Sequence, residues 1–72
     1  MSFHVYKKIE LVGSSDTSIE DAISNAIAVA SSSLQNIDWF EVVETRGEVR
    51  EGAITYYQVT VRVGFRLNKD AG

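Results

Sequence analysis

The most regular pattern in the chain lies in the strand predicted from about Ile54 to Leu67, where side chains alternate in character from Tyr57 onward. In an extended strand one face would carry Tyr57, Val59, Val61, Val63, Phe65 and Leu67, and the other Gln58, Thr60, Arg62, Gly64 and Arg66. Weaker alternation predicts two more strands, over His4 to Val12 and over Trp39 to Val49. Between the last two strands, Glu51 and Gly52 form a two-residue hairpin turn.

Between the first two strands, apolar residues recur every three or four positions, the spacing of one helix face. The stripe consists of Ile19, Ala22, Ile23, Ala26, Ile27, Ala30, Leu34 and Ile37. Ser18 and Asp21 have the spacing of a capping box, so the helix is expected to begin there, after a turn-rich connection over residues 13–17. The sequence therefore predicts an α+β fold of order β-α-β-β, with a three-stranded antiparallel sheet and one helix.

The hairpin turn also predicts how its two strands pair. Counting outward from Arg50 opposite Ala53 pairs Trp39 with Gly64, Phe40 with Val63, Glu41 with Arg62, Val42 with Val61 and Thr45 with Gln58. This register stacks apolar pairs on one face and places an ion pair on the other. It sets the Trp39 indole beside a residue without a side chain. A bulge at Gly47 would shift the pairing by one residue.

One helix covers one face of such a sheet, so the opposite face has no cover within the chain. An exposed indole beside the gap at Gly64 suits the stacking of a flat ring, and packing of Trp39 in a subunit interface is the alternative. Both arrangements could hold at once. Because a chain of this length buries only about 60% of its unfolded surface, partner subunits or a ligand are expected to complete the core.

Composition excludes several classes of protein. The 7 basic and 10 acidic residues give a net charge of −3, which disfavours nucleic acid as a partner. One histidine and no cysteine leave no conventional zinc site and no disulfide, and we expect no metal. No apolar run approaches the roughly 18 residues that cross a bilayer, and no secretory signal pattern is present. We expect one domain, residues 1–72, in a cytoplasmic protein.

Candidate catalytic residues form no set that the sequence brings together. The serines lack a nucleophile elbow, and no rule pairs any two of the acidic residues. Arg46 and Arg66 are permanently charged donors suited to phosphate, with surface solubility or an intersubunit salt bridge as the alternative. We therefore expect a binding protein and not an enzyme.

Four short sequence segments, which occur in a fixed order along the chain, are together specific enough to indicate a protein family. They are Asp38-Trp39-Phe40-Glu41-Val42, Arg46-Gly47, Tyr57-Gln58-Val59 and Val63-Gly64-Phe65-Arg66-Leu67, preceded by Tyr6-Lys7-Lys8-Ile9-Glu10-Leu11-Val12-Gly13. With these segments the chain resembles a dodecin of the bacterial type over nearly its whole length. The resemblance implies a hollow homododecamer that binds flavin, each subunit a three-stranded antiparallel sheet curled around one helix.

The resemblance also implies roles for individual residues. Trp39 would stack on the isoalloxazine ring near the two-fold axes, Gln58 would hydrogen-bond the polar edge of the ring, and Arg46 would contribute to the flavin site. Lys7 and Arg66, with Tyr6 as a further candidate, would hold the phosphate of FMN or coenzyme A near the three-fold axes. The helix has Ala28 and three serines where several relatives carry basic residues, so flavin is the primary ligand expected.

The function expected is flavin storage and sequestration. An indole in contact with a flavin quenches the excited flavin by electron transfer, and the chain offers no obvious group for turnover. FMN is the flavin expected, with riboflavin or another flavin as the alternative. A small flavin-dependent reductase and a structural interaction module without a ligand remain the alternative functions.

The predicted register separates two of these residues within one chain. Trp39 and Gln58 would lie about 20 Å apart along the hairpin, which is more than one isoalloxazine spans. We therefore expect the two side chains at one flavin to come from different subunits, with a bulge near Gly47 and a strong bend as the alternative.

Overall fold

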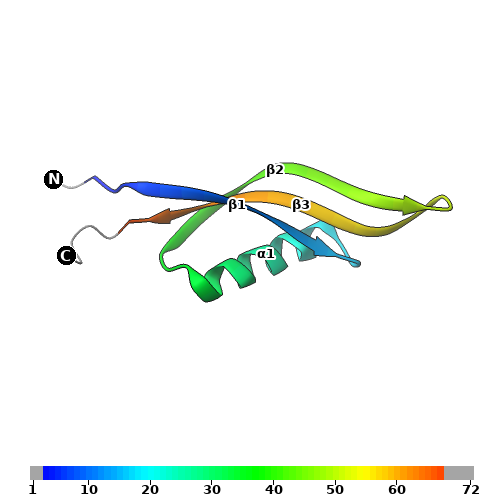
Figure 1. Cartoon of the computed structure of the whole chain (residues 1–72), viewed down its shortest axis with the longest axis horizontal. Coiled ribbons are helices and arrows are strands. Elements are labelled where there is room, and N and C mark those ends of the chain that lie inside the picture. Colours follow the sequence, from blue (N-terminus) through cyan, green and yellow to red (C-terminus); the bar gives the residue numbers. More distant parts are fainter. Residues whose placement is uncertain (1–2, 68–72) are drawn as a thin grey trace.

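The computed structural model describes residues 3–67 of the chain. Its elements are β1 (Tyr6–Ser15), α1 (Ile19–Ser33), β2 (Ile37–Arg50) and β3 (Ala53–Arg66) (Figure 1). The strands form one antiparallel sheet in the order β1-β3-β2. The predicted α+β fold with β-α-β-β order is confirmed.

Strand β1 runs three residues further than expected. The sequence placed Gly13 in a turn, but it pairs with Val59 inside the sheet. A Cβ at this position would collide with the backbone oxygen of Ala22 and lie 2.8 Å from the Cβ of Ala26. Glycine thus serves here for a close approach between strand and helix, and the turn begins only after Ser15.

The start of α1 was predicted correctly. Ser18 is the N-cap, and its hydroxyl oxygen accepts a hydrogen bond of 3.0 Å from the backbone N–H of Asp21. The carboxylate of Asp21 does not return a bond to Ser18. It accepts a 2.6 Å hydrogen bond from the hydroxyl of Ser15, which ties the end of β1 to the first turn of the helix.

The helix ends earlier than its apolar stripe. α1 stops at Ser33, and Leu34 is already extended at φ −116° and ψ 144°. Asn36 then takes a left-handed conformation, at φ 65°, and Ile37 begins β2. The expectation that Leu34 and Ile37 continue the helix was wrong, because the serines at its end favour the helix weakly and Asn36 tolerates the reversal.

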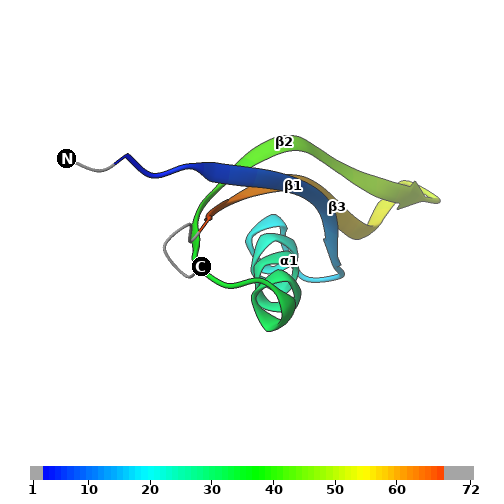
Figure 2. The same cartoon turned by 60° about the vertical axis from the view of Figure 1, so that its left-hand side comes forward.

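The core lies between α1 and two of the three strands. Figures 1 and 2 show α1 beneath one face of the sheet, and its contacts are with β1 and β3. The buried apolar side chains are Ala22, Ala26, Ala30, Val59, Val61 and Val63. Phe40 and Val42 pair with Val63 and Val61 and face the same side, yet each is 47% exposed. One helix therefore leaves β2 uncovered, which the sequence did not predict.

The folded chain is long and thin. It measures 56 × 20 × 13 Å, and its radius of gyration is 15.1 Å, against about 11 Å for a compact domain of this length. The β2–β3 hairpin extends past the helix (Figure 1). A shape of this kind leaves much of the sheet without a partner in the chain.

The hairpin turn and both ends of its register were predicted correctly. Glu51 and Gly52 have positive φ angles of 52° and 80°, as a two-residue turn requires. The confirmed pairs are Arg50 with Ala53, Val42 with Val61, Glu41 with Arg62, Phe40 with Val63 and Trp39 with Gly64.

The middle of the hairpin is shifted by one residue. The register skips Thr55 in β3 and Val43 in β2, and the two irregularities cancel, so only the pairs between them move. Gln58 therefore lies opposite Arg46 and not opposite Thr45. A one-residue shift near Gly47 is therefore present, between Glu48 and Val49, but the extra residue is Thr55 of β3, and Gly47 itself pairs regularly with Tyr57.

Candidate functional site

The face of the sheet turned away from α1, called here the outer face, carries the candidate site. Its residues by register are Tyr6, Lys8, Glu10, Val12 and Ser14 of β1, Trp39, Glu41, Glu44, Arg46 and Glu48 of β2, and Gln58, Thr60, Arg62, Gly64 and Arg66 of β3. Strict alternation from Trp39 would turn Arg46 toward the helix side. The extra residue Val43 resets the alternation, so Arg46 shares the outer face with Trp39.

The indole of Trp39 lies directly over Gly64. A Cβ on Gly64 would collide with three carbon atoms of the indole. Tyr6 borders the indole at a centroid distance of 6.2 Å and an interplanar angle of 47°. Trp39 remains 38% exposed. One side of the ring is thus supported by backbone while part of the ring stays open, which suits the stacking of a planar aromatic ligand.

A line of alternating charges runs beside the indole. Lys8 Nζ lies 3.0 Å from Glu41 Oε2 and 5.9 Å from the centroid of the Trp39 ring. Arg62 Nη1 lies 3.6 Å from the same carboxylate oxygen, and Arg62 Nε lies 3.0 Å from Glu10 Oε1. The predicted pair of Glu41 with Arg62 is present, but each of the two has a closer partner on β1.

These contacts shift two pKa values. The hydrogen bond and charge of Lys8 lower the pKa of Glu41, with a smaller contribution from Arg62. The hydrogen bond and charge of Glu10 raise the pKa of Arg62. Both groups are thereby held in their charged forms. Sequence reasoning missed Lys8 and Glu10 because no turn links β1 directly to β3, and only the β1–β3 register places them there.

The predicted site residues fall into two groups along the outer face. Tyr6 lies opposite Arg66, close to Trp39, while Arg46 lies opposite Gln58. Gln58 is six positions along β3 from Gly64, the partner of Trp39, a separation of about 20 Å. One chain does not bring both groups to one ring.

Lys7 lies apart from both groups. It pairs with Phe65, and its side chain therefore belongs to the helix side of the sheet. Tyr6 and Arg66, the other phosphate candidates, belong to the outer face.

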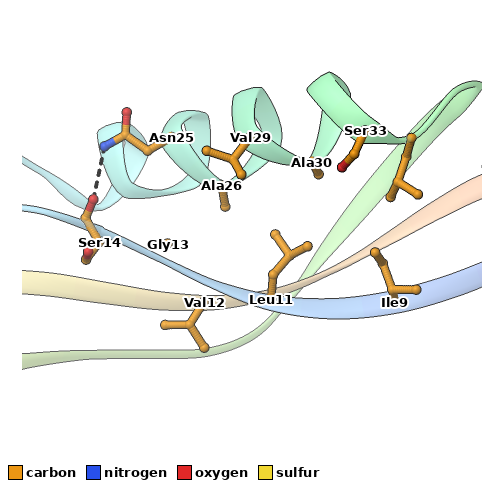
Figure 3. A pocket seen from close by; sticks show the side chains of 11 residues that line it. Ile9, Leu11, Val12, Gly13, Ser14, Asn25, Ala26, Val29, Ala30 and Ser33 are labelled. Carbon is orange, nitrogen blue, oxygen red and sulfur yellow. Dashed lines mark hydrogen bonds between the residues drawn. The ribbon is translucent and has the colours of Figure 1, made fainter.

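An apolar groove of about 400 Å³ runs between α1 and β1 (Figure 3). Its wall consists of Ile9, Leu11, Val12, Gly13, Ser14, Asn25, Ala26, Val29, Ala30, Ser33 and Leu34. At one end Asn25 donates a 3.0 Å hydrogen bond to the carbonyl oxygen of Ser14. The groove contains no charged side chain and none of the predicted site residues, so it offers nothing that recognises a phosphate.

Two further features concern residues 3–67. No group of three His, Cys, Asp or Glu side chains in this part of the chain is placed to hold a metal ion. No helix among these residues is long and apolar enough to span a membrane.

Comparison with known proteins places the chain in a family. The Dodecin family profile matches residues 5–68. The curated Dodecin of Thermus thermophilus is 51% identical over 65 residues, which are 90% of this chain and 94% of the relative. The structure of dodecin from Streptomyces coelicolor is 40% identical, with a TM-score of 0.89 over 96% of this chain and 99% of the other. A tryptophan-to-phenylalanine mutant of the Thermus thermophilus dodecin is 48% identical, with a TM-score of 0.87 over 93% and 100%. The chain therefore belongs to the dodecin family.

Proposed function

We propose that this protein stores and sequesters flavin. FMN, or a related flavin such as riboflavin, stacks on Trp39 at subunit interfaces of a hollow homododecamer, which buffers free flavin and quenches its photochemistry. The observation that carries the proposal is the half-open indole lying over Gly64 on an outer face that the chain does not cover.

The shape of the subunit supports an assembled site. The elongated subunit leaves apolar side chains of β2 exposed on one face and Trp39 exposed on the other. Because Gln58 and Arg46 lie about 20 Å from Trp39, the polar groups that meet a ring stacked on Trp39 come from a second subunit. Ligand binding then favours assembly, since the ligand binds only the assembled form.

The cations of the outer face suggest how a phosphate is held. Arg46 beside Gln58 contacts the phosphate of FMN when Gln58 contacts the ring edge, because the two side chains are cross-strand neighbours. Arg66 and Tyr6 form a second phosphate-binding pair, and coenzyme A near the three-fold axes is the second ligand proposed. Lys7 would reach that ligand from the helix side of the sheet.

The chemistry near the indole supports binding and not catalysis. A general acid or base works best with a pKa close to the working pH. Lys8 lowers the pKa of Glu41, which lies on the outer face two residues from Trp39, and so moves it further from neutrality. This carboxylate is therefore a poor proton donor at neutral pH, which argues against a flavin-dependent reductase that would use it. A structural module without a ligand would leave the open indole without a role.

The test is a titration of the flavin-free protein with FMN and riboflavin, followed by flavin fluorescence, with native mass measured in parallel. We expect both flavins to bind to a dodecamer and to lose most of their fluorescence on binding. Trp39→Ala should abolish most of the binding and the quenching while the oligomer persists. Trp39→Phe should keep the fold, as the similar mutant of the Thermus protein does, and should bind more weakly.

The matched control is Phe3→Ala, which removes an aromatic ring that is 83% exposed and precedes β1. It should leave flavin affinity unchanged. Wild-type affinity and quenching in Trp39→Ala would exclude the stacking site. Steady-state oxidation of NAD(P)H would favour a reductase, and failure of both flavins to bind would favour the structural module.

A further inference from the structure

Gly64 makes room for two side chains. It pairs with Trp39 on one side and with Lys8 on the other. With no side chain between them, Lys8 extends across β3, and its ammonium reaches the carboxylate of Glu41, two residues from Trp39 along β2. The cation is thereby held 5.9 Å from the centre of the ring.

We propose that the Lys8–Glu41 ion pair tunes how readily the Trp39 indole gives up an electron to a ring stacked on it. This inference rests on the proposed function, because the accepting ring is a flavin. Neither residue is assigned a contact with the ligand. Both act through Trp39 and are positioning and tuning residues.

The step that is tuned transfers one electron and breaks no bond. On excitation, the indole loses one electron and the stacked ring gains it, and return of that electron restores both partners without a proton or a further reactant. An ammonium near the indole disfavours the positive charge that forms there, and a carboxylate favours it. At 5.9 Å one unit charge changes the oxidation equilibrium of the indole about threefold even at the dielectric constant of water.

The ion pair is placed to keep these two effects in balance. Glu41 is bonded to Lys8 at 3.0 Å and lies 3.6 Å from Arg62. Arg62 is in turn bonded to Glu10. The four charges alternate and sum to zero, so removing one member of the Lys8–Glu41 pair leaves a net charge beside the indole.

The test compares Lys8→Met, Glu41→Gln and the double variant, each loaded with FMN, by the fluorescence lifetime of the bound flavin. Lys8→Met leaves a net negative charge, so quenching should accelerate by about twofold or more. Glu41→Gln leaves a net positive charge, so quenching should slow. The double variant should return close to the wild-type lifetime.

The opposite signs separate tuning from a structural role. If the pair only kept the indole in place, both single variants would loosen the ring and lengthen the lifetime together, and that result would overturn the proposal. Equal lifetimes in all variants would overturn it as well. Glu48→Gln is the control, because it breaks an ion pair of 3.2 Å with Arg50 at the far end of the hairpin, and it should leave the lifetime unchanged.

A second readout needs no flavin. Trp39 is the only tryptophan of the chain, so its own emission reports the field of the ion pair in the ligand-free protein. Lys8→Met and Glu41→Gln should shift the emission maximum in opposite directions. Opposite shifts in a protein that fails to bind FMN would overturn the flavin assignment alone. Flavin binding with no shift, or with shifts of one sign, would overturn the tuning alone.

Discussion

Gly13 and Gly64 lie on opposite faces of the sheet, and each lets a neighbour come closer than any side chain would allow. At Gly13 the neighbour is helix α1, whose nearest atoms are the backbone oxygen of Ala22 and the Cβ of Ala26. At Gly64 the neighbour is a single ring, that of Trp39. The first contact closes the core, and the second prepares a surface for a ligand.

The difference shows that stability and binding are divided between the two faces. On the helix side, Val59, Val61 and Val63 are fully buried by α1. On the outer face, Trp39 is supported only by other parts of the sheet and stays partly open. Equal substitutions on the two faces should therefore have unequal consequences, and the effects below run from the largest to the smallest.

Gly13→Ala should have the largest effect. The added Cβ would meet a backbone oxygen, which moves only if α1 moves, so we expect a loss of about 3 kcal/mol in the free energy of unfolding, at the upper end of overpacking effects. Denaturant unfolding measures it. Ser14→Ala is the neighbouring control, because the carbonyl of Ser14, and not its side chain, accepts the bond from Asn25. Equal stability of the two variants would contradict the close contact.

Val61→Ala and Val42→Ala form the next comparison, since the two residues are cross-strand partners facing the helix side. Val61 is 0% exposed and Val42 is 47% exposed. From burial within one chain, we expect Val61→Ala to cost about 1.5–3 kcal/mol and Val42→Ala about half as much, and cover by a neighbouring subunit would add to the cost of Val42→Ala. Thermal unfolding at equal concentration gives both values. Equal losses would show that a neighbouring subunit covers β2.

Gly64→Ala should separate binding from folding. The methyl group would displace the indole from its place on β3, so FMN affinity should fall about tenfold, equivalent to 1.4 kcal/mol. Unfolding stability should change less than in Gly13→Ala, because a ring at the surface moves more easily than a helix. Thr60→Ser, on the same face of β3 and four residues away, is the control. Unchanged FMN affinity in Gly64→Ala would argue against this placement of the ring.

The hairpin shows what the sequence predicts well and what it does not. The Glu51-Gly52 turn determines the register next to it, and the alternation of β3 is strong enough to indicate its buried face. The middle of the hairpin was predicted one residue out of register, because Val43 and Thr55 are ordinary strand residues and nothing local marks them as extra. Gly47, where the sequence suggested a bulge, instead lets β2 lie close to β3, because a Cβ there would be 2.9 Å from the backbone oxygen of Tyr56.

Part of the candidate site could not be predicted from the sequence, for a different reason. Trp39 and Gly64 are joined by a short hairpin, so counting from the turn brings them together. Lys8 and Tyr6 reach the indole only through the β1–β3 pairing. No turn joins β1 to β3, because α1 and β2 lie between them in the chain. The register of this pair therefore depends on tertiary packing. The placement of Arg46 likewise depended on the bulge at Val43.

The smallest effect concerns the pH dependence contributed by the outer face. Lys8 lowers the pKa of Glu41 below its ordinary value of 4.5. A carboxyl group whose pKa is lower in the folded state stabilises the fold at pH values above its unfolded pKa, and this contribution disappears as the pH falls through the folded pKa. The group is exposed to solvent, so the contribution is small beside those of the buried valines.

The measurement is the difference in unfolding free energy between the wild type and Glu41→Gln as a function of pH. The difference should be constant near neutral pH, begin to shrink below about pH 4.5, and vanish once the carboxyl group of the folded protein is protonated. In a Lys8→Met background the same difference should be smaller and flatter, because the main cause of the lowered pKa has been removed. A difference that grows as the pH falls would mean that folding raises the pKa of Glu41. The Lys8 contact would then not hold the carboxylate, and the balance of charges beside Trp39 would be lost with it.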